Sequence, residues 1–243
     1  MHKKFKSLFS IKKLAFTLAE TLIVMGVIGV VAALTLPNLN QSTNNKEKVA
    51  KVKKIYTNLN DALGRAVAVY GPVNEWFVKD DNNNQTRTKR FAERMTEFMK
   101  LTKVCGIGTG NGCFVQNDAT YWDGTGRPDS PYNWDWGYSV VTADGTSVHF
   151  EYNSENNIAI SVDIDGQKGK YAWGVDLFKF DINNGGNELT PTGISYTDDQ
   201  LKTKCFNPNN SDSGGCTGWV IQNENMDYLK CASSLSWSKT TCK

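Results

Sequence analysis

The sequence predicts an α+β protein: a long N-terminal transmembrane and stalk helix leads into a globular head with an antiparallel β-sheet and a disulfide-stapled C-terminal region. Three observations predict this fold. An apolar run covers residues 16–36, a helical pattern continues to residue 70, and short β-rich runs follow, with all six cysteines beyond residue 100. We therefore expect a helix at 16–70 and a head at 71–243.

The charge of the chain is unevenly placed. The whole chain of 243 residues carries a net charge of +2, but its first fifteen residues contain five lysines and no acidic residue. Without these five, 22 basic residues face 25 acidic ones (27 − 5 = 22), so the remainder carries −3. Because nucleic-acid-binding domains present a basic face, this balance argues against a nucleic-acid partner for the head.

The apolar run at 16–36 contains no Lys or Arg, and its single charged residue is Glu20. As a helix it is about 32 Å long, which matches the roughly 30 Å hydrocarbon core of a bilayer. The run therefore predicts a membrane-spanning helix. The alternative is a cleaved secretory signal peptide, with the small residues at 31–33 as its cleavage pattern and Leu34 as the first mature residue.

The order of residues at the start of this run is more specific. A basic leader and Ala15 precede Phe16-Thr17-Leu18-Ala19-Glu20 and an unbroken apolar stretch. This arrangement resembles the prepilin N-terminal signal of type IV pilins and type II secretion pseudopilins. The resemblance implies that residues 1–15 are a leader, and that a prepilin peptidase removes it by cutting before Phe16 and methylates the new amine. It also makes Pro37 the site of a helix kink. Ala15 stands where the family usually has glycine.

The resemblance implies a structural subunit that polymerises through its N-terminal helix, in a type IV pilus or a type II secretion system. Glu20 would neutralise the N-terminal amine of a neighbouring subunit. The implied partners are copies of the chain or related pilins, the prepilin peptidase and inner-membrane lipid. The subunit would start in the inner membrane with its head outside the cytoplasm, and end in a cell-surface or periplasmic filament.

Two other classes of protein are weighed against the filament subunit. One is a membrane-anchored or secreted binding module that recognises a sugar or a surface and forms no filament; a mature N-terminus at Leu34 rather than Phe16 would favour it. The other is an extracytoplasmic enzyme. The sequence has no nucleophile–base pair, phosphate loop or metal motif that stands out, so we expect no enzymatic activity and no cofactor other than the calcium considered below.

The head is predicted from periodicity. Between residues 49 and 70, apolar side chains recur every three or four positions, which predicts an amphipathic helix packing on the head and ending at Gly71-Pro72. A second helix is expected around Phe91–Leu101. Strands are expected at 138–142, 146–152, 158–164 and 175–182, with a hairpin turn at Asp144-Gly145.

The run Asp163-Ile164-Asp165-Gly166 has alternate carboxylates and a glycine, the pattern of an oxygen-ligand calcium loop. Asp163 and Asp165, with Asp176, are the candidate ligands. The pattern lacks the bidentate glutamate of an EF-hand, and Asp165-Gly166 is equally the centre of a hairpin turn.

Six cysteines with only two histidines indicate disulfides outside the cytoplasm rather than a zinc site. Fifteen pairings are possible. Neighbours in sequence favour three local bridges: Cys105–Cys113, Cys205–Cys216 and Cys231–Cys242. The main competing scheme pairs Cys216 with Cys231 and Cys205 with Cys242.

Overall fold

The computed structural model divides the chain into two compact units, 1–44 and 45–243. The structure describes residues 17–77, 83–108, 110, 112–115, 119–126, 135–154, 157–169, 171–183, 186–207 and 214–242; for residues 34–42 it describes the backbone alone. Most of the described residues belong to the second unit, which we call the head. The two units are described separately.

Helix α1 runs from Leu18 to Tyr70, a length of 53 residues, and only its second part belongs to the head. In that part Val49, Val52, Leu59 and Leu63 are buried, while Tyr56, Val67 and Tyr70 are partly buried against the same core. These are the positions that the sequence pattern assigned to the packed face, so this prediction is confirmed. Gly71 follows the helix with a positive φ of 78°, a conformation that glycine adopts without strain.

The expected membrane-spanning helix is wrong for the part of the chain that the structure describes. Among those residues, no helix is both long enough and apolar enough to cross a membrane. Helix α1 continues past the apolar run into the polar and amphipathic residues that follow Pro37. The α+β class and the antiparallel sheet are correct.

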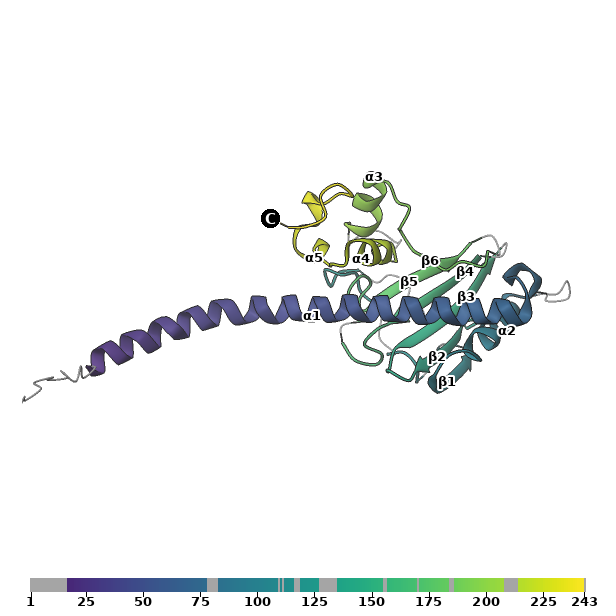
Figure 1. The fold of residues 1–243 in the computed structure, drawn as a ribbon, viewed down its shortest axis with the longest axis horizontal. Helices are drawn as coiled ribbons and strands as arrows, with labels where there is room; N and C mark the ends of the chain where they lie inside the picture. Colours follow the sequence, from purple (N-terminus) through teal and green to yellow (C-terminus); the bar gives the residue numbers. More distant parts are fainter. Residues whose placement is uncertain are drawn as a thin grey trace, which may run out of the picture. The chain divides into compact units, whose positions relative to one another are not determined.

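The head is built on one antiparallel sheet whose six strands lie in sequence order (Figure 1). Its strands are β1 (Leu101–Ile107), β2 (Tyr138–Thr142), β3 (Ser147–Ser154), β4 (Asn157–Asp163), β5 (Leu177–Ile182) and β6 (Thr190–Pro191). Strands that are consecutive in the sequence are neighbours in the sheet throughout.

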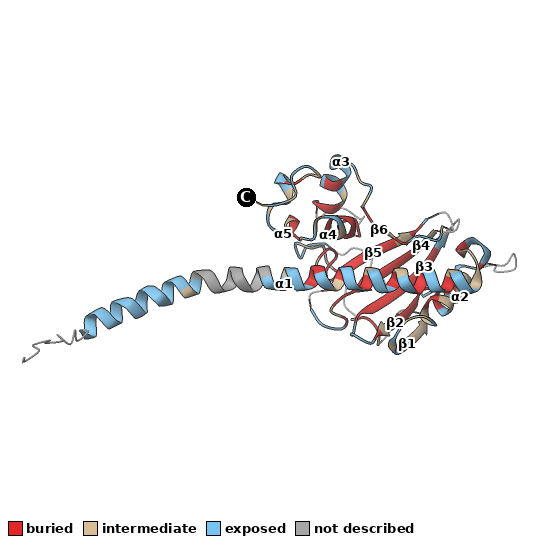
Figure 2. Ribbon diagram, in the orientation of Figure 1, coloured by how far each residue is buried: buried red, intermediate tan, exposed pale blue. Residues whose placement is uncertain are grey.

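The main core lies between α1 and one face of the sheet (Figure 2). Ile160 on β4 lies opposite Phe150 on β3 and Phe180 on β5. Residues directly opposite each other on paired strands point to the same face of the sheet, so these three side chains share the face toward α1. All three are fully buried. The ring of Tyr56 on α1 stacks on Phe180 with centroids 5.6 Å apart. The face that α1 covers is therefore set by the register of the hairpins.

Helix α2 (Asn84–Thr96) packs on the same core. Asn83 caps its N-terminus by accepting a hydrogen bond from the Thr86 N–H at 2.8 Å. Phe91, Ala92 and Met95 are buried, and Phe91 contacts Phe150 edge to face. A short helix, η1 (Val73–Glu75), joins α1 to the loop before α2.

The C-terminal region is made of short helices: α3 (Asp198–Gln200), η3 (Leu201–Cys205), α4 (Thr217–Asn223), α5 (Tyr228–Cys231) and η4 (Ala232–Ser234). It contributes Trp219 and Tyr228 to the main core. The disulfides are Cys105–Cys113, Cys205–Cys216 and Cys231–Cys242, closing intervals of 8, 11 and 11 residues. The local pairing scheme is confirmed. Each short closed loop stabilises the fold by about 3 kcal/mol in the chain-entropy model.

The expected strands agree with β2, β3, β4 and β5 to within two residues. Strand β1 was not expected, because Leu101 was assigned to the end of a helix and the following residues to a loop. Helix α2 ends at Thr96, and β1 then pairs with β2 through two register shifts. Bulges of this kind break the alternation from which strands are predicted.

Leu59 and Val69 test which face of α1 holds the head together. Leu59 is fully buried, so Leu59→Ala is expected to lower the free energy of unfolding by about 2–5 kcal/mol. Val69 lies on the same helix but is 62% exposed, so Val69→Ala is expected to change it by less than about 0.5 kcal/mol. Thermal and urea unfolding of the full chain measure both; equal losses would contradict this packing.

Candidate functional site

The first candidate site is the start of α1. Thr17 precedes the helix, and its side-chain Oγ1 accepts a hydrogen bond from the Glu20 N–H at 3.2 Å. In return, the Glu20 carboxylate accepts from the Thr17 N–H at 2.9 Å and from the Thr17 hydroxyl at 2.8 Å. This reciprocal arrangement is a capping box, in which two backbone N–H groups that the helix leaves unpaired are satisfied. Glu20 therefore fixes where α1 begins.

These hydrogen bonds also set the charge of Glu20. The Thr17 N–H and the Thr17 hydroxyl both donate to the carboxylate, and this lowers the pKa of Glu20 below its ordinary value. The positive end of the helix dipole favours a negative charge at the same place. The helix thus begins with an exposed, ionised carboxylate. The capping role of Glu20 was not predicted from the sequence, although the pattern Thr-x-x-Glu before an apolar run indicates it.

Residues 18–33 of α1 carry large apolar side chains around the helix, and Glu20 is the single charged residue among them. We call residues 18–33 the apolar arm. Nine of its large side chains are between 51% and 80% exposed, and they are Leu18, Leu22, Ile23, Val24, Met25, Val27, Ile28, Val30 and Val31. Helices with apolar residues all round are normally buried, and an exposed patch of this kind marks an interaction surface.

The structure describes no side-chain contacts for three of the site residues that were predicted from the sequence. Ala15 and Phe16, the expected cleavage and methylation site, lie outside the described residues. Pro37 lies within the bounds of α1, but its side chain also lies outside what the structure describes, so the expected kink remains a prediction.

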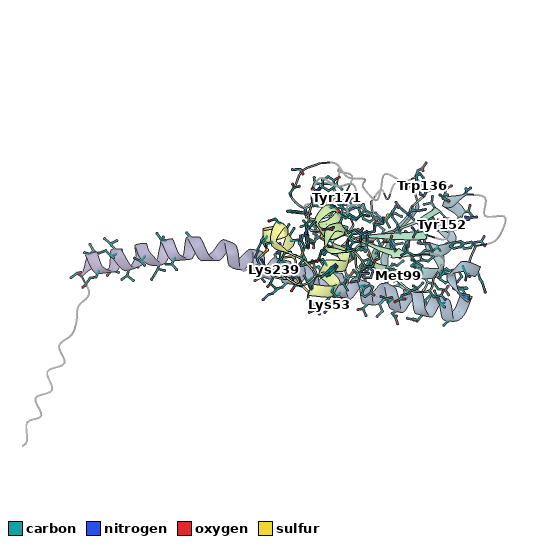
Figure 3. All side chains as sticks on the ribbon, turned by 90° about the horizontal axis from the view of Figure 1, so that it is seen from above. Lys53, Met99, Trp136, Tyr152, Tyr171 and Lys239 are labelled. Atoms are coloured by element: carbon teal, nitrogen blue, oxygen red, sulfur yellow. A yellow bond between two sulfur atoms is a disulfide. The ribbon has the colours of Figure 1, made fainter. Side chains whose placement is uncertain are left out.

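The second candidate site is a group of ion pairs between α1 and loops of the head. From the sequence, the lysines at 46–54 are expected on a solvated helix face or in contact with lipid headgroups; the structure pairs four of them with acidic residues. Lys53 lies 2.5 Å from Glu224 (Lys53 is labelled in Figure 3), and Lys54 lies 2.8 Å from Asp144. Lys51 lies 2.8 Å from Asp165 Oδ1. These pairs are partly exposed, so each contributes about 1 kcal/mol or less.

Lys48 differs from the other lysines because it is buried. Its side chain is 8% exposed, and its Nζ atom lies 3.6 Å from Asp165 Oδ2 and 3.8 Å from Asp176 Oδ2. Asp176 is fully buried, and its Oδ1 accepts a hydrogen bond from the Ala172 N–H at 3.2 Å. The positive charge of Lys48 thus lies next to two carboxylates that belong to the predicted calcium loop.

Asp163 is the third carboxylate of this loop. Its Oδ1 accepts from the Asp165 N–H at 3.1 Å, whereas its buried Oδ2 has no hydrogen-bond partner in the described part of the chain. Burial raises the pKa of the Asp163 carboxyl to about 8; the charges of Asp176 and Asp165 add to the rise, and the N–H groups of Asp165 and Gly166 oppose it.

The structure places the expected calcium ligands close to one another but gives them a different partner. Within the described residues, no group of three or more His, Cys, Asp or Glu side chains could hold a metal ion as it stands. The distances of 3.6 and 3.8 Å from Lys48 Nζ fit an ammonium among carboxylates. Calcium ligands lie at about 2.3–2.6 Å from the ion. The Asp-x-Asp-Gly pattern correctly located a cluster of carboxylates, but a lysine from α1 balances its charge.

A third polar cluster lies on the other face of the sheet. His149 Nδ1 is 2.7 Å from the Ser139 Oγ, and His149 Nε2 is 3.1 Å from Glu151 Oε1. The order serine, histidine, glutamate is that of a hydrolase triad. However, Ser139 and His149 are both fully buried, and Phe114 packs edge to face on the imidazole. A substrate cannot reach Ser139 in this arrangement, which instead satisfies three buried polar groups.

No family model, no curated protein and no solved structure matches the chain.

Asp163 should make the stability of the head depend on pH. Between pH 3.8 and about 8 the folded chain retains a proton on this carboxyl that the unfolded chain has lost. The contribution of Asp163 to the free energy of unfolding is therefore greatest at low pH and falls as the pH rises toward 8. Asp163→Asn is neutral at every pH, so its Tm relative to the wild type is expected to increase from pH 5 to pH 8.

The control is Asp199→Asn, which changes a carboxylate that is 94% exposed and pairs with Lys202. Its Tm relative to the wild type should change little over the same interval. Thermal unfolding followed by circular dichroism gives both differences. If the Asp163→Asn difference were the same at pH 5 and pH 8, the protonated state of Asp163 would be refuted.

Proposed function

We propose that this chain is a structural filament subunit, a pilin or pseudopilin of a type IV pilus or type II secretion system, which assembles through its N-terminal helix. In this role the head stays outside the cytoplasm, a prepilin peptidase cuts before Phe16, and the partners in the filament are copies of the chain or related subunits. The function requires no catalytic step.

The observation that carries the proposal is the exposure of the apolar arm. Fully burying one large aliphatic side chain is worth about 1.5–3 kcal/mol, and nine such side chains lie more than half exposed. Arms of neighbouring copies, packed side by side, would cover them. A secreted binding module with a mature N-terminus at Leu34 would lose this arm, whereas a filament subunit keeps it as its packing surface. The arm therefore favours the filament subunit over that alternative.

The state of Glu20 supports the same proposal. Its carboxylate is exposed, ionised and held at the start of the helix by Thr17. Cleavage before Phe16 would leave an amine one turn from the carboxylate of each copy. When arms pack, the amine of one copy can pair with the Glu20 carboxylate of another, and an arm out of register would leave both charges unpaired in an apolar environment.

The first test of the proposal removes this charge. Glu20→Ala should strongly reduce incorporation of the full chain into filaments, because the incoming amine loses its partner. Glu47→Ala is the matched control, since Glu47 is an exposed acid of the same helix and pairs with Lys51. Incorporation is measured by shearing filaments from cells and blotting. Normal incorporation of Glu20→Ala would refute the assembly role of Glu20.

The second test addresses the apolar arm. Ile23 and Val69 are similarly exposed, at 67% and 62%, but only Ile23 belongs to the arm. Ile23→Asp places a charge in the proposed contact between arms and should abolish self-association of the purified chain. Val69→Asp should leave it unchanged. Sedimentation velocity compares the two, and equal association of both variants would exclude the arm as the assembly surface.

A further inference from the structure

The sheet of the head ends in two edge strands that differ in the charge around them. Strand β1 forms one edge and β6 the other, because the six strands are ordered as in the sequence (Figure 1). Residues 84–107, which include α2 and β1, contain six basic and two acidic residues, a net charge of +4. Residues 180–200, which include β6 and α3, contain four acidic residues and no basic one. We call these two regions the basic edge and the acidic edge.

The basic edge presents its charge to solvent. Lys100 and Lys103 are both exposed, and neither pairs with a carboxylate in the described part of the chain. Lys103 donates a hydrogen bond to the Gly112 carbonyl at 2.7 Å, which leaves its positive charge unbalanced. Val104, the next residue on β1, is 55% exposed. A partner that covers this edge would therefore bury apolar surface as well as meet the two ammonium groups.

The acidic edge is accessible in the same way. Glu188 precedes β6, is exposed, and has no basic partner among the residues that the structure describes. Asp199 in α3 is 94% exposed and lies 3.5 Å from Lys202, three residues further along the chain. A pair of two exposed side chains contributes little to stability, so Asp199 can exchange Lys202 for the cation of a partner at little cost.

The backbone of the two edges does not favour the addition of a further strand. Strand β1 pairs with β2 through two register shifts and carries Lys103. Strand β6 is two residues long, and one of them is Pro191, which has no N–H to donate. Bulges, edge lysines and prolines are features that prevent the strands of separate chains from pairing. A partner at these edges is therefore held by side-chain charges rather than by a continuous sheet.

The proposed filament requires two different contact surfaces on each head. Arms that pack side by side in one register relate neighbouring copies by a rotation and a translation, not by a two-fold axis. A contact of this kind is heterologous, since it joins one surface of a copy to a different surface of the next copy. Two edges of opposite charge on the same head meet this requirement, whereas two edges of like charge would repel each other.

We propose that successive copies in the filament contact each other edge to edge, with the basic edge of one head facing the acidic edge of the next. Lys100 and Lys103 form the first surface. Glu188 and Asp199 form the second. The inference rests on the proposed filament and adds a second contact to that of the apolar arms. The arms bury apolar surface, and the edges select the neighbouring head and its orientation, because charge complementarity at an interface gives specificity.

Charge reversal in the full chain tests this contact. Lys100→Glu with Lys103→Glu makes both edges acidic. Glu188→Lys with Asp199→Lys makes both edges basic. Each of these double variants should be incorporated into filaments at least about tenfold less than the wild type, because like charges then face each other. Incorporation is measured by shearing filaments from cells and blotting.

Two rescue experiments separate a lost contact from a damaged head. Expressed together, the two double variants should co-assemble, since each edge of one then meets the opposite charge on the other. The quadruple variant, which carries all four substitutions, should assemble by itself because its two edges are again opposite in charge. Lys100→Glu alone leaves the hydrogen bond of Lys103 in place and should still reduce incorporation.

The matched control is Lys168→Glu with Lys230→Glu. Both lysines are exposed and lie outside the two edges, and their reversal changes the net charge by the same amount as the reversal of Lys100 and Lys103. This control should be incorporated like the wild type. The Tm of every variant, followed by circular dichroism, should stay within about 3 °C of the wild type, because the substituted side chains are exposed.

The results distinguish this contact from the filament proposal on which it rests. A wild type that forms no filaments would overturn both proposals. If the wild type assembles and Glu20→Ala does not, while the two double variants are incorporated as well as the control, only the edge contact is refuted. The edge contact is also refuted if neither the quadruple variant nor the mixture of double variants assembles better than each double variant alone.

Discussion

The packing of one stripe of α1 on one face of the sheet is the constraint on which the head depends. Val52, Leu59 and Leu63 lie fully or almost fully buried against the face that carries Phe150 and Phe180. Because a helix turns by a fixed angle per residue, placing this stripe on the core also fixes the direction of every other side chain in this part of α1. The ion pairs of Lys48, Lys51, Lys53 and Lys54 follow from that orientation.

This dependence explains why a lysine-rich segment contributes to the fold rather than forming a free basic surface. The apolar stripe supplies the stabilisation, and the lysines beside it pair with acidic residues of the head, Lys48 and Lys51 both with Asp165. Of the four, Lys48 alone is buried, and removing one partner of a buried pair costs about 3–5 kcal/mol because the other charge is left uncompensated. The exposed pairs position loops at little gain in stability.

Local patterns in the sequence predicted the parts of the fold that local chemistry determines. The stripe of α1, the hairpins of the central strands and the three disulfides were all predicted from spacing. What could not be predicted depends on residues far apart in the chain. Lys51 and Asp165 are 114 positions apart, so the Asp-x-Asp-Gly pattern gave no indication that lysines would balance it. Strand β1 was missed because its bulges remove the alternation. The capping box of Thr17 and Glu20 was local and could have been found.

The arrangement of the disulfides along the chain has a consequence for how the protein can mature. Each bridge joins a cysteine to the next one in sequence, so no bridge encloses or crosses another. The three covalent loops follow one another along the chain without overlapping. Oxidation in any order therefore leaves every strand free to pair. A head of this topology can form its bridges before, during or after the sheet without becoming threaded.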